Sequence, residues 1–297
     1  MEIVLLTGGT GFIGSKVVRR LMGVSGLRVY VLSRYPRKDD GNVSYIEGDI
    51  TNIGMLKHQI AKYHPTILCH LAWNVEGDSR DNTPQEQCWK NWSIALARQF
   101  LEAGGKHIVS SGTCFEYDVF QNCLLEESMR TDPHTAYGAA KVDVCSAMQE
   151  LCRQYGARFV WGRIFYAYGP GEAKRKLLTS LKTTLLSGER FVSKTPEFVV
   201  DYIHVEDVAA ILVKCITDVS VAGILNICSG QGVRIRDLVL RMAYLFKKED
   251  YVNFSSNGAR MFVVGDNKRL RALGYKYQYD LPSGIATYAS GGRCEKN

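Results

Sequence analysis

The hydrophobic positions of this chain fall into short continuous runs that alternate with longer stretches of helical spacing. The first run, IVLLT (3–7), is typical of a buried strand, and residues 12–22 follow with apolar positions on one helix face. The predicted strands are 3–7, 28–33, 43–50, 66–72, 107–113 and 157–165, and the predicted helices are 12–22, 52–63, 87–104 and 135–155. This alternation predicts an α/β fold of the Rossmann type, a doubly wound parallel sheet with helices on both faces.

After residue 166 the alternation becomes irregular. Residues 173–188 predict a helix, 199–216 predict a strand followed by a helix, and 224–230 predict a seventh strand. We therefore expect two parts. The first, residues 1–166 with 198–230, forms an NAD(P)-binding domain, and the second, residues 167–197 with 231–297, forms a small substrate-binding lobe near the carboxyl edge of the sheet.

Composition narrows the class of protein. Hydrophobic residues make up 46% and charged residues 23%, which is ordinary for a globular protein. The net charge of +7 is not carried by a polybasic run, so a nucleic-acid partner has little support. The nine cysteines include no CxxC pair, so we expect no metal site and a reducing compartment. We expect a cytoplasmic protein, because neither a signal peptide nor a membrane-spanning run is visible.

A glycine-rich turn joins the first predicted strand to the first helix. In TGGTGFIG (7–14), glycines recur every three residues. Such a turn lets the backbone approach a pyrophosphate, and the following helix offers free N–H groups to it. Its place between a strand and a helix favours a dinucleotide site over a turn without a ligand. The residues expected to contact the cofactor here are Gly8, Gly11, Phe12, Ile13 and Gly14.

The residues at the end of the second strand indicate which dinucleotide binds. A carboxylate there would accept the ribose 2′-hydroxyl of NAD, whereas this chain has Ser33 and Arg34. Arginine attracts a 2′-phosphate, so NADP(H) is favoured and NAD(H) stays possible. Alternatively, Arg34 is a solvated surface residue. Asp49, after the third strand, is placed to accept the adenine amino group, and a turn-forming role fits it equally.

Tyr137 and Lys141 share one face of the predicted helix 135–155. Their spacing brings the two Cβ atoms to about 5–6 Å. A tyrosine pKa near 10 is too high for proton exchange at neutrality, and a nearby ammonium is expected to lower it. Thr113 ends a strand at the carboxyl edge, where such sheets bind ligands. A surface Tyr–Lys pair and a strand-end threonine are the alternatives, and the surrounding motifs favour a catalytic group.

The motifs together resemble those of the extended short-chain dehydrogenase/reductases, and more narrowly the bacterial nucleoside-diphosphate-sugar epimerase/dehydratase/reductase group. They are TGGTGFIG (7–14), GDI (48–50), HLAW (70–73), SSGT (110–113), YGAAK (137–141), RIFYAYGPGE (163–172), DYIHVEDVA (201–209) and VGDNKRLRALGY (264–275). The resemblance covers nearly the whole chain and also implies a homodimer formed through a two-helix face.

The resemblance implies roles for individual residues. Tyr137 matches the catalytic tyrosine, Lys141 matches the lysine that tunes it and holds the nicotinamide ribose, and Thr113 matches the residue that hydrogen-bonds the reacting oxygen. Asn91 matches a structural asparagine of the active site. Further residues that the resemblance places near the cofactor are Ile50, Leu71 and Ala72.

The residues after Thr113 distinguish the reactions of this group. The 4,6-dehydratases have an Asp-Glu pair there, whereas this chain has Cys114 and Phe115, so a dehydratase is not expected. We expect NADPH-dependent reduction of the C4 ketone of a nucleoside-diphosphate 4-keto-6-deoxysugar. The alternatives are an NAD-retaining epimerase and a non-catalytic dinucleotide-sensing protein. Cys114 is either a packing thiol or a base beside the ketone.

The substrate side carries weaker signals. Tyr166 stands where many members have an asparagine, and Arg234 and Arg260 are candidates for binding the diphosphate, to which arginine is suited. Val200 replaces an arginine that the family usually has before its DYIHV motif. For each basic residue a solvated position is the alternative. Lys174, Arg175 and Lys176 are further candidates for binding the diphosphate. Ser110 and Ser111 either line the same pocket as Thr113 or satisfy the backbone at the strand end, and Arg163 is either structural or close to the cofactor.

Overall fold

The computed structural model describes residues 1–74, 82–255, 258 and 260–291 of the 297-residue chain. By its contacts the chain forms two compact units. The first comprises residues 1–118, 127–164 and 209–225, and the second comprises residues 119–126, 165–208 and 226–297. The predicted division rests on the change in the hydrophobic pattern after residue 166, and the assignment of dinucleotide and sugar to separate parts stays a prediction.

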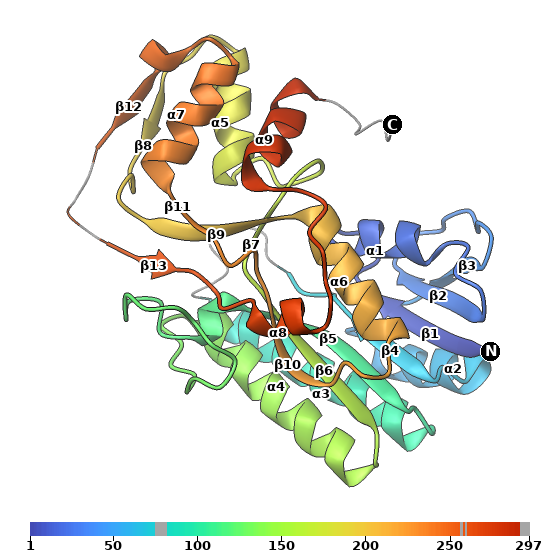
Figure 1. Cartoon of the computed structure of the whole chain (residues 1–297). Coiled ribbons are helices and arrows are strands. Elements are labelled where there is room, and N and C mark those ends of the chain that lie inside the picture. The colour runs from blue at the N-terminus through green and yellow to red at the C-terminus, as the bar shows by residue number, and fades with distance from the viewer. Residues whose placement is uncertain (75–81, 256–257, 259, 292–297) are drawn as a thin grey trace. The chain divides into compact units, whose positions relative to one another are not determined.

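A seven-stranded sheet organises the first unit, in the order β10-β6-β5-β4-β1-β2-β3 (Figure 1). Its strands are β1 (Glu2–Thr7), β2 (Leu27–Ser33), β3 (Val43–Glu47), β4 (Ile67–His70), β5 (His107–Thr113), β6 (Arg158–Ile164) and β10 (Gly223–Ile227). Neighbouring strands from β6 to β3 are parallel. The strand order reverses between β1 and β4, which confirms the doubly wound α/β fold and marks the edge position where such sheets bind ligands.

Helices cover both faces of this sheet (Figure 1). On one face lie α2 (Ile53–Tyr63), α3 (Thr83–Glu102) and α4 (Ala136–Gln154), whose apolar residues share one buried core with the strands. On the other face lie α1 (Gly14–Leu21) and the part of α6 (Val205–Thr217) that belongs to this unit. Because both faces are buried, the strands are continuous apolar runs, which is why their positions could be predicted from the sequence.

The second unit contains the short elements that the hydrophobic pattern did not predict. These are β7 (Tyr166–Tyr168), β8 (Phe191–Ser193), β11 (Gly232–Arg234), β12 (Val252–Phe254) and β13 (Phe262–Val263). With β9 (Val199–His204), β7, β11 and β13 form a four-stranded sheet, and β12 pairs with β8. The helices are α5 (Leu177–Leu186), α7 (Ile235–Leu245), α8 (Lys268–Ala272) and α9 (Leu281–Ser290). Strands of two or three residues are too short to show a period, so only their tertiary pairing defines them.

Two buried carboxylates hold the end of the chain within the second unit. Asp201 accepts hydrogen bonds from the backbone N–H groups of Ser229 and Gly230, each at 2.8 Å. Asp207 accepts the hydroxyl of Tyr275 at 2.8 Å and the N–H of Gln278 at 2.7 Å. The DYIHVEDVA motif therefore ties the strand β9 and helix α6 to residues more than twenty positions further along the chain.

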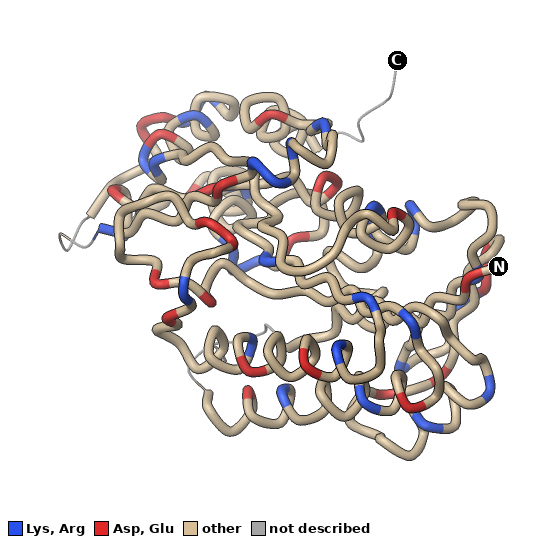
Figure 2. Tube along the Cα trace, turned by 60° about the horizontal axis from the view of Figure 1, so that its bottom comes forward, with Lys and Arg blue, Asp and Glu red and all other residues tan. Residues whose placement is uncertain are grey.

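Figure 2 shows that Lys and Arg residues are interspersed with Asp and Glu residues along the described part of the chain. Among the described residues, no helix is both long enough and apolar enough to cross a membrane.

Candidate active site

The glycine turn between β1 and α1 is closed by backbone contacts. Gly8 has a φ of 75°, and an added Cβ there would lie 2.6 Å from the backbone nitrogen of Ala72, just after β4. An added Cβ at Gly14 would lie 2.1 Å from the carbonyl oxygen of Gly8. The N–H of Gly11 donates to that same carbonyl at 3.0 Å. Residues larger than glycine therefore cannot keep this turn so close to the end of β4.

The start of α1 fits a dinucleotide pyrophosphate. Ile13 occupies the N-cap position, and within the described residues no side chain caps its N-terminus. No acidic residue stands in the first turn, so the free N–H groups and the positive end of the helix dipole are not neutralised. Phe12 and Ile13 are half-buried at this turn. The residues present thus suit the phosphates of the expected cofactor.

The other residues predicted to bind the cofactor lie at the ends of β2, β3 and β4. Ser33 is buried and its hydroxyl donates to the carbonyl of Tyr35 at 2.7 Å, whereas Arg34 is exposed. Asp49 accepts the N–H of Thr51 at 2.9 Å, as in the turn-forming alternative. Ile50 is buried, and Leu71 and Ala72 are half-buried.

The close approach of α4 to the end of β5 brings Tyr137 to Thr113. An added Cβ at Gly138 would lie 2.2 Å from the carbonyl oxygen of Phe115, so only glycine allows this approach. Thr135 caps α4 by accepting the N–H of Gly138 at 3.0 Å. The Thr113 hydroxyl is hydrogen-bonded to the Tyr137 phenol. The structure therefore brings together two of the three residues predicted to be catalytic.

Burial raises the pKa of Tyr137, and the hydrogen bond from Thr113 opposes that rise only in part. The expectation that the pKa of this phenol is lowered is therefore wrong for this structure. A phenol with a raised pKa stays protonated at neutral pH, which is the form that can donate a proton to a developing alkoxide.

Lys141 completes the group. Its side chain is buried, and its ammonium donates to the carbonyl oxygen of Ser111 at 2.8 Å. Burial lowers the pKa of Lys141 to about 7, although the carboxylates of Glu116 and Glu86 act to raise it. This lysine can therefore gain and lose a proton near neutrality, unlike an exposed lysine.

Glu116 is a residue of this site that the sequence did not reveal. It is fully buried, and its carboxylate accepts the backbone N–H of Thr113 at 2.8 Å and the indole N–H of Trp161 at 2.9 Å. Arg163, whose role the sequence left open, donates from Nε to the other oxygen at 2.7 Å. The carboxylate thus fixes the end of β5, where Thr113 faces Tyr137. Glu116 ends a helical turn of only three residues, Cys114–Glu116, and so short a segment has no periodic pattern from which its role could be predicted.

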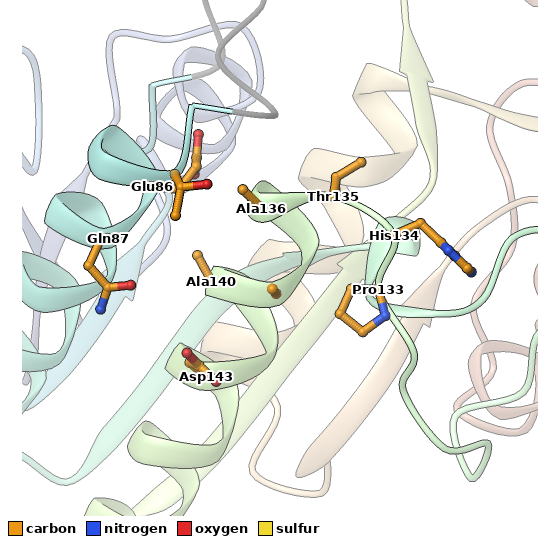
Figure 3. A pocket seen from close by; sticks show the side chains of 10 residues that line it. Glu86, Gln87, Pro133, His134, Thr135, Ala136, Ala140 and Asp143 are labelled. Atoms are coloured by element: carbon orange, nitrogen blue, oxygen red, sulfur yellow. The ribbon is translucent and has the colours of Figure 1, made fainter.

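A pocket of about 410 Å³ lies between the starts of α3 and α4 (Figure 3). Glu86 and Gln87 line it from α3, and Ala136, Ala140 and Asp143 line it from α4. Tyr137 and Lys141 are not among its lining residues. This pocket therefore borders the catalytic group without containing it. Among the described residues, no cluster of His, Cys, Asp and Glu is arranged to hold a metal ion.

The residues predicted on the substrate side are more scattered. Cys114 is buried beside Tyr137, in keeping with the packing alternative. Tyr166 packs against Tyr202 with ring centroids 5.6 Å apart. Arg234 lies 4.0 Å from a carboxylate oxygen of Glu197. Other exposed basic candidates are Lys174, Arg175, Lys176 and Arg260. Their roles toward a substrate stay predictions.

Local packing bears on the roles predicted for the polar residues Asn91, Ser110 and Ser111. Asn91 is exposed on α3, whereas Ser93 of the same helix is buried and is hydrogen-bonded to His70 Nε2 at 2.9 Å. The expected placement of Asn91 inside the active site is therefore wrong. Ser110 donates to the carbonyl oxygen of His70 at 3.2 Å, which is the structural alternative. Ser111 contributes its backbone carbonyl to Lys141.

Comparison with known proteins identifies the family of this chain. Residues 4–228 match the family described as the NAD dependent epimerase/dehydratase family. The chain belongs to this family. It is 26% identical to a UDP-glucose 4-epimerase of Rhizobium leguminosarum bv. trifolii over 312 aligned residues, which cover 94% of each chain.

A second relative and a solved structure extend the comparison. It is 24% identical to a dTDP-6-deoxy-L-talose 4-dehydrogenase (NAD(+)) of Aggregatibacter actinomycetemcomitans, over 80% of this chain and 87% of the relative. The crystal structure of a UDP-glucose 4-epimerase from Thermotoga maritima with UDP-glucose superposes with a TM-score of 0.86 at 22% identity, covering 97% of each chain. That structural likeness supports the fold.

Gly14→Ala should lower the free energy of unfolding by about 1–3 kcal/mol, because the added methyl group overlaps the Gly8 carbonyl. Urea denaturation measures the change. Gly54→Ala on α2 is the matched control, since an added Cβ there meets only an atom at 3.7 Å. That control should be neutral or stabilising by up to about 1 kcal/mol. Equal effects of the two substitutions would contradict the close approach of the turn.

Glu116→Gln should lower the free energy of unfolding by about 3–5 kcal/mol, because it leaves the buried Arg163 guanidinium without its carboxylate. Asp143→Asn, which breaks the exposed ion pair with Lys90, should cost no more than about 1 kcal/mol. Denaturant titrations of both variants beside the unmodified protein give the comparison. If Glu116→Gln were no more costly than the control, the buried pair would not hold the end of β5.

Proposed function

We propose that this protein is an NADP(H)-dependent oxidoreductase acting at C4 of a nucleoside-diphosphate sugar, and that it reduces the ketone of a 4-keto-6-deoxysugar. The observation that supports this most is the group formed by the buried Thr113 and Lys141 and the half-buried Tyr137 at the carboxyl edge of the sheet. It offers a protonated phenol, a hydroxyl bonded to it and an ammonium, which are the groups that proton transfer to a carbonyl oxygen requires.

When bound, the nicotinamide dinucleotide supplies the hydride that C4 receives. Tyr137 then donates its phenolic proton to the C4 oxygen, which becomes the alcohol. The Thr113 hydroxyl orients that oxygen and stabilises the negative charge that develops on it. Lys141, held by the Ser111 carbonyl, stabilises the phenolate that remains on Tyr137. The glycine turn and the start of α1 would hold the pyrophosphate.

The preference for NADP(H) is supported by the end of β2. Ser33 and Arg34 stand there without a carboxylate that would repel a 2′-phosphate, and the exposed Arg34 guanidinium lies 6.0 Å from the centre of the Tyr35 ring. The curated 4-dehydrogenase relative is named as an NAD(+) enzyme, so NAD(H) stays the alternative. The predictions of a cytoplasmic location and a homodimer belong to this proposal.

A second candidate is an epimerase that keeps its dinucleotide and returns the hydride to the same sugar. The similarity to UDP-glucose 4-epimerases favours it. The two functions separate in a simple assay. A reductase consumes NADPH with a 4-keto sugar nucleotide, followed at 340 nm, whereas an epimerase interconverts UDP-glucose and UDP-galactose with no net change in that absorbance.

Tyr137→Phe should reduce turnover at least about 100-fold, because it removes the proton donor. NADPH affinity, measured by calorimetry, should stay unchanged. Tyr155→Phe at the exposed end of α4 is the control and should keep full activity. Turnover retained in Tyr137→Phe, under conditions where the control is fully active, would refute the assigned acid.

Arg34→Ala should weaken NADPH binding about tenfold or more, since a charge-assisted contact to the 2′-phosphate is worth about 1.5–3 kcal/mol. NADH affinity should not change, because NADH lacks that phosphate. Lys62→Ala on α2 removes an equal charge from another exposed position and serves as the control. Equal loss of NADPH and NADH affinity in Arg34→Ala would contradict recognition of the 2′-phosphate.

A further inference from the structure

Trp73, directly after β4, contacts three charged or catalytic groups at once. The Lys141 ammonium lies 3.8 Å from the centre of the Trp73 ring. The ring of Tyr137 packs edge-on against Trp73 with centroids 6.0 Å apart. The indole N–H donates to an Oε2 oxygen of Glu86 at 2.8 Å. No role was expected from the sequence for Trp73 or for Glu86.

Glu86 is a carboxylate buried at the start of α3, opposite Ala136 of α4 (Figure 3). Its Oε1 atom is buried and has no hydrogen-bond partner within the described residues. Burial raises the pKa of Glu86, and the bond from Trp73 acts against that rise. A buried carboxylate with one donor is costly, so a nearby positive charge is needed to compensate it. Lys141 is the cation that interacts with it electrostatically.

The indole connects these two charges. A carboxylate that accepts the indole N–H draws positive charge to that edge and leaves the ring face more negative. An ammonium over the face of a tryptophan is attracted by about 2 kcal/mol or more when both are removed from water. The Glu86 carboxylate and the Lys141 ammonium therefore stabilise each other through the ring as well as through space.

We propose that Trp73 and Glu86 are positioning residues for Lys141: the Glu86 carboxylate polarises the Trp73 indole, and the ring face holds the ammonium charged beside Tyr137. This inference rests on the proposed function for its catalytic meaning. Its electrostatic content, that Glu86 raises the proton affinity of Lys141 through Trp73, stands on the geometry alone.

Three other titratable side chains lie close to Lys141 and bear on its pKa. Glu116, from the turn after β5, raises the pKa of Lys141. His70, at the end of β4, has a pKa lowered to about 3 by burial and by Lys141, so it stays neutral. Tyr137 stays protonated, since burial raises its pKa. Lys141, with a pKa of about 7, is thus the group expected to change charge on the face of Trp73 near neutral pH, and the carboxylates of Glu116 and Glu86 raise that pKa.

The test is the pH dependence of tryptophan fluorescence in the ligand-free protein. The emission of an indole responds to a charge on its face, so the unmodified protein should show a transition near pH 7. Glu86→Gln keeps an oxygen for the indole N–H but removes the charge, so the midpoint should fall by about one pH unit. Glu102→Gln, at the exposed end of the same helix, should leave the midpoint unchanged.

Two further variants identify the signal. Lys141→Met should abolish the transition. Trp73→Phe should reduce its amplitude and lower its midpoint, which Trp161 still reports, because its ring lies 5.8 Å from the same ammonium. A Glu86→Gln midpoint equal to that of the unmodified protein would overturn the proposal, as would a transition that survives Lys141→Met.

The pH profile of turnover separates this inference from the proposed function. In Glu86→Gln the fall of kcat at high pH should move to lower pH together with the fluorescence midpoint. If no sugar nucleotide is turned over while the fluorescence midpoint still shifts, the proposed reaction fails and the positioning role stands. If turnover occurs and the pH profile of kcat is the same in Glu86→Gln as in the unmodified protein, the positioning role fails and the proposed reaction stands.

Discussion

The candidate active site depends on one buried carboxylate, that of Glu116. Its two oxygens take the backbone N–H of Thr113, the indole N–H of Trp161 and the guanidinium of Arg163, with no water-exposed surface left. A charge removed from water in this way is tolerated only while every donor stays in place. The end of β5 therefore has one low-energy arrangement, and the hydroxyl of Thr113 is held where the phenol of Tyr137 meets it.

Around that fixed point the site gathers charges of both signs in a region shielded from solvent. Glu116 and Glu86 flank Lys141, and burial of the ammonium works against both of them. The balance leaves a lysine that titrates near neutrality next to a phenol that remains protonated, which is a suitable starting state for donating a proton to a carbonyl oxygen. Small changes in either carboxylate should therefore alter the chemistry more than changes at the exposed basic residues.

The family and the fold do not specify which reaction this protein catalyses, so that question rests on the residues of the site. This chain is similar to UDP-glucose 4-epimerases and to a sugar-nucleotide 4-dehydrogenase, so the comparisons do not single out one reaction. In the proposed reductase, Ser33 and Arg34 at the end of β2 select the cofactor. A reductase must exchange its dinucleotide at every cycle, so its specificity for a 2′-phosphate has a direct consequence for turnover.

The doubly wound sheet, the glycine turn, the strand-end position of Thr113 and the shared helix face of Tyr137 and Lys141 could be predicted from the sequence, because each depends on periodicity or spacing within one short segment. The remaining features depend on packing between segments that are distant in the sequence. The short strands of the second unit form by pairing, Asn91 is exposed on α3 where Ser93 is buried, and burial reverses the expected shift in the pKa of Tyr137. Glu116, Glu86 and Trp73 act through partners that are distant in sequence, and desolvation depends on what surrounds a group in space, which no local pattern records.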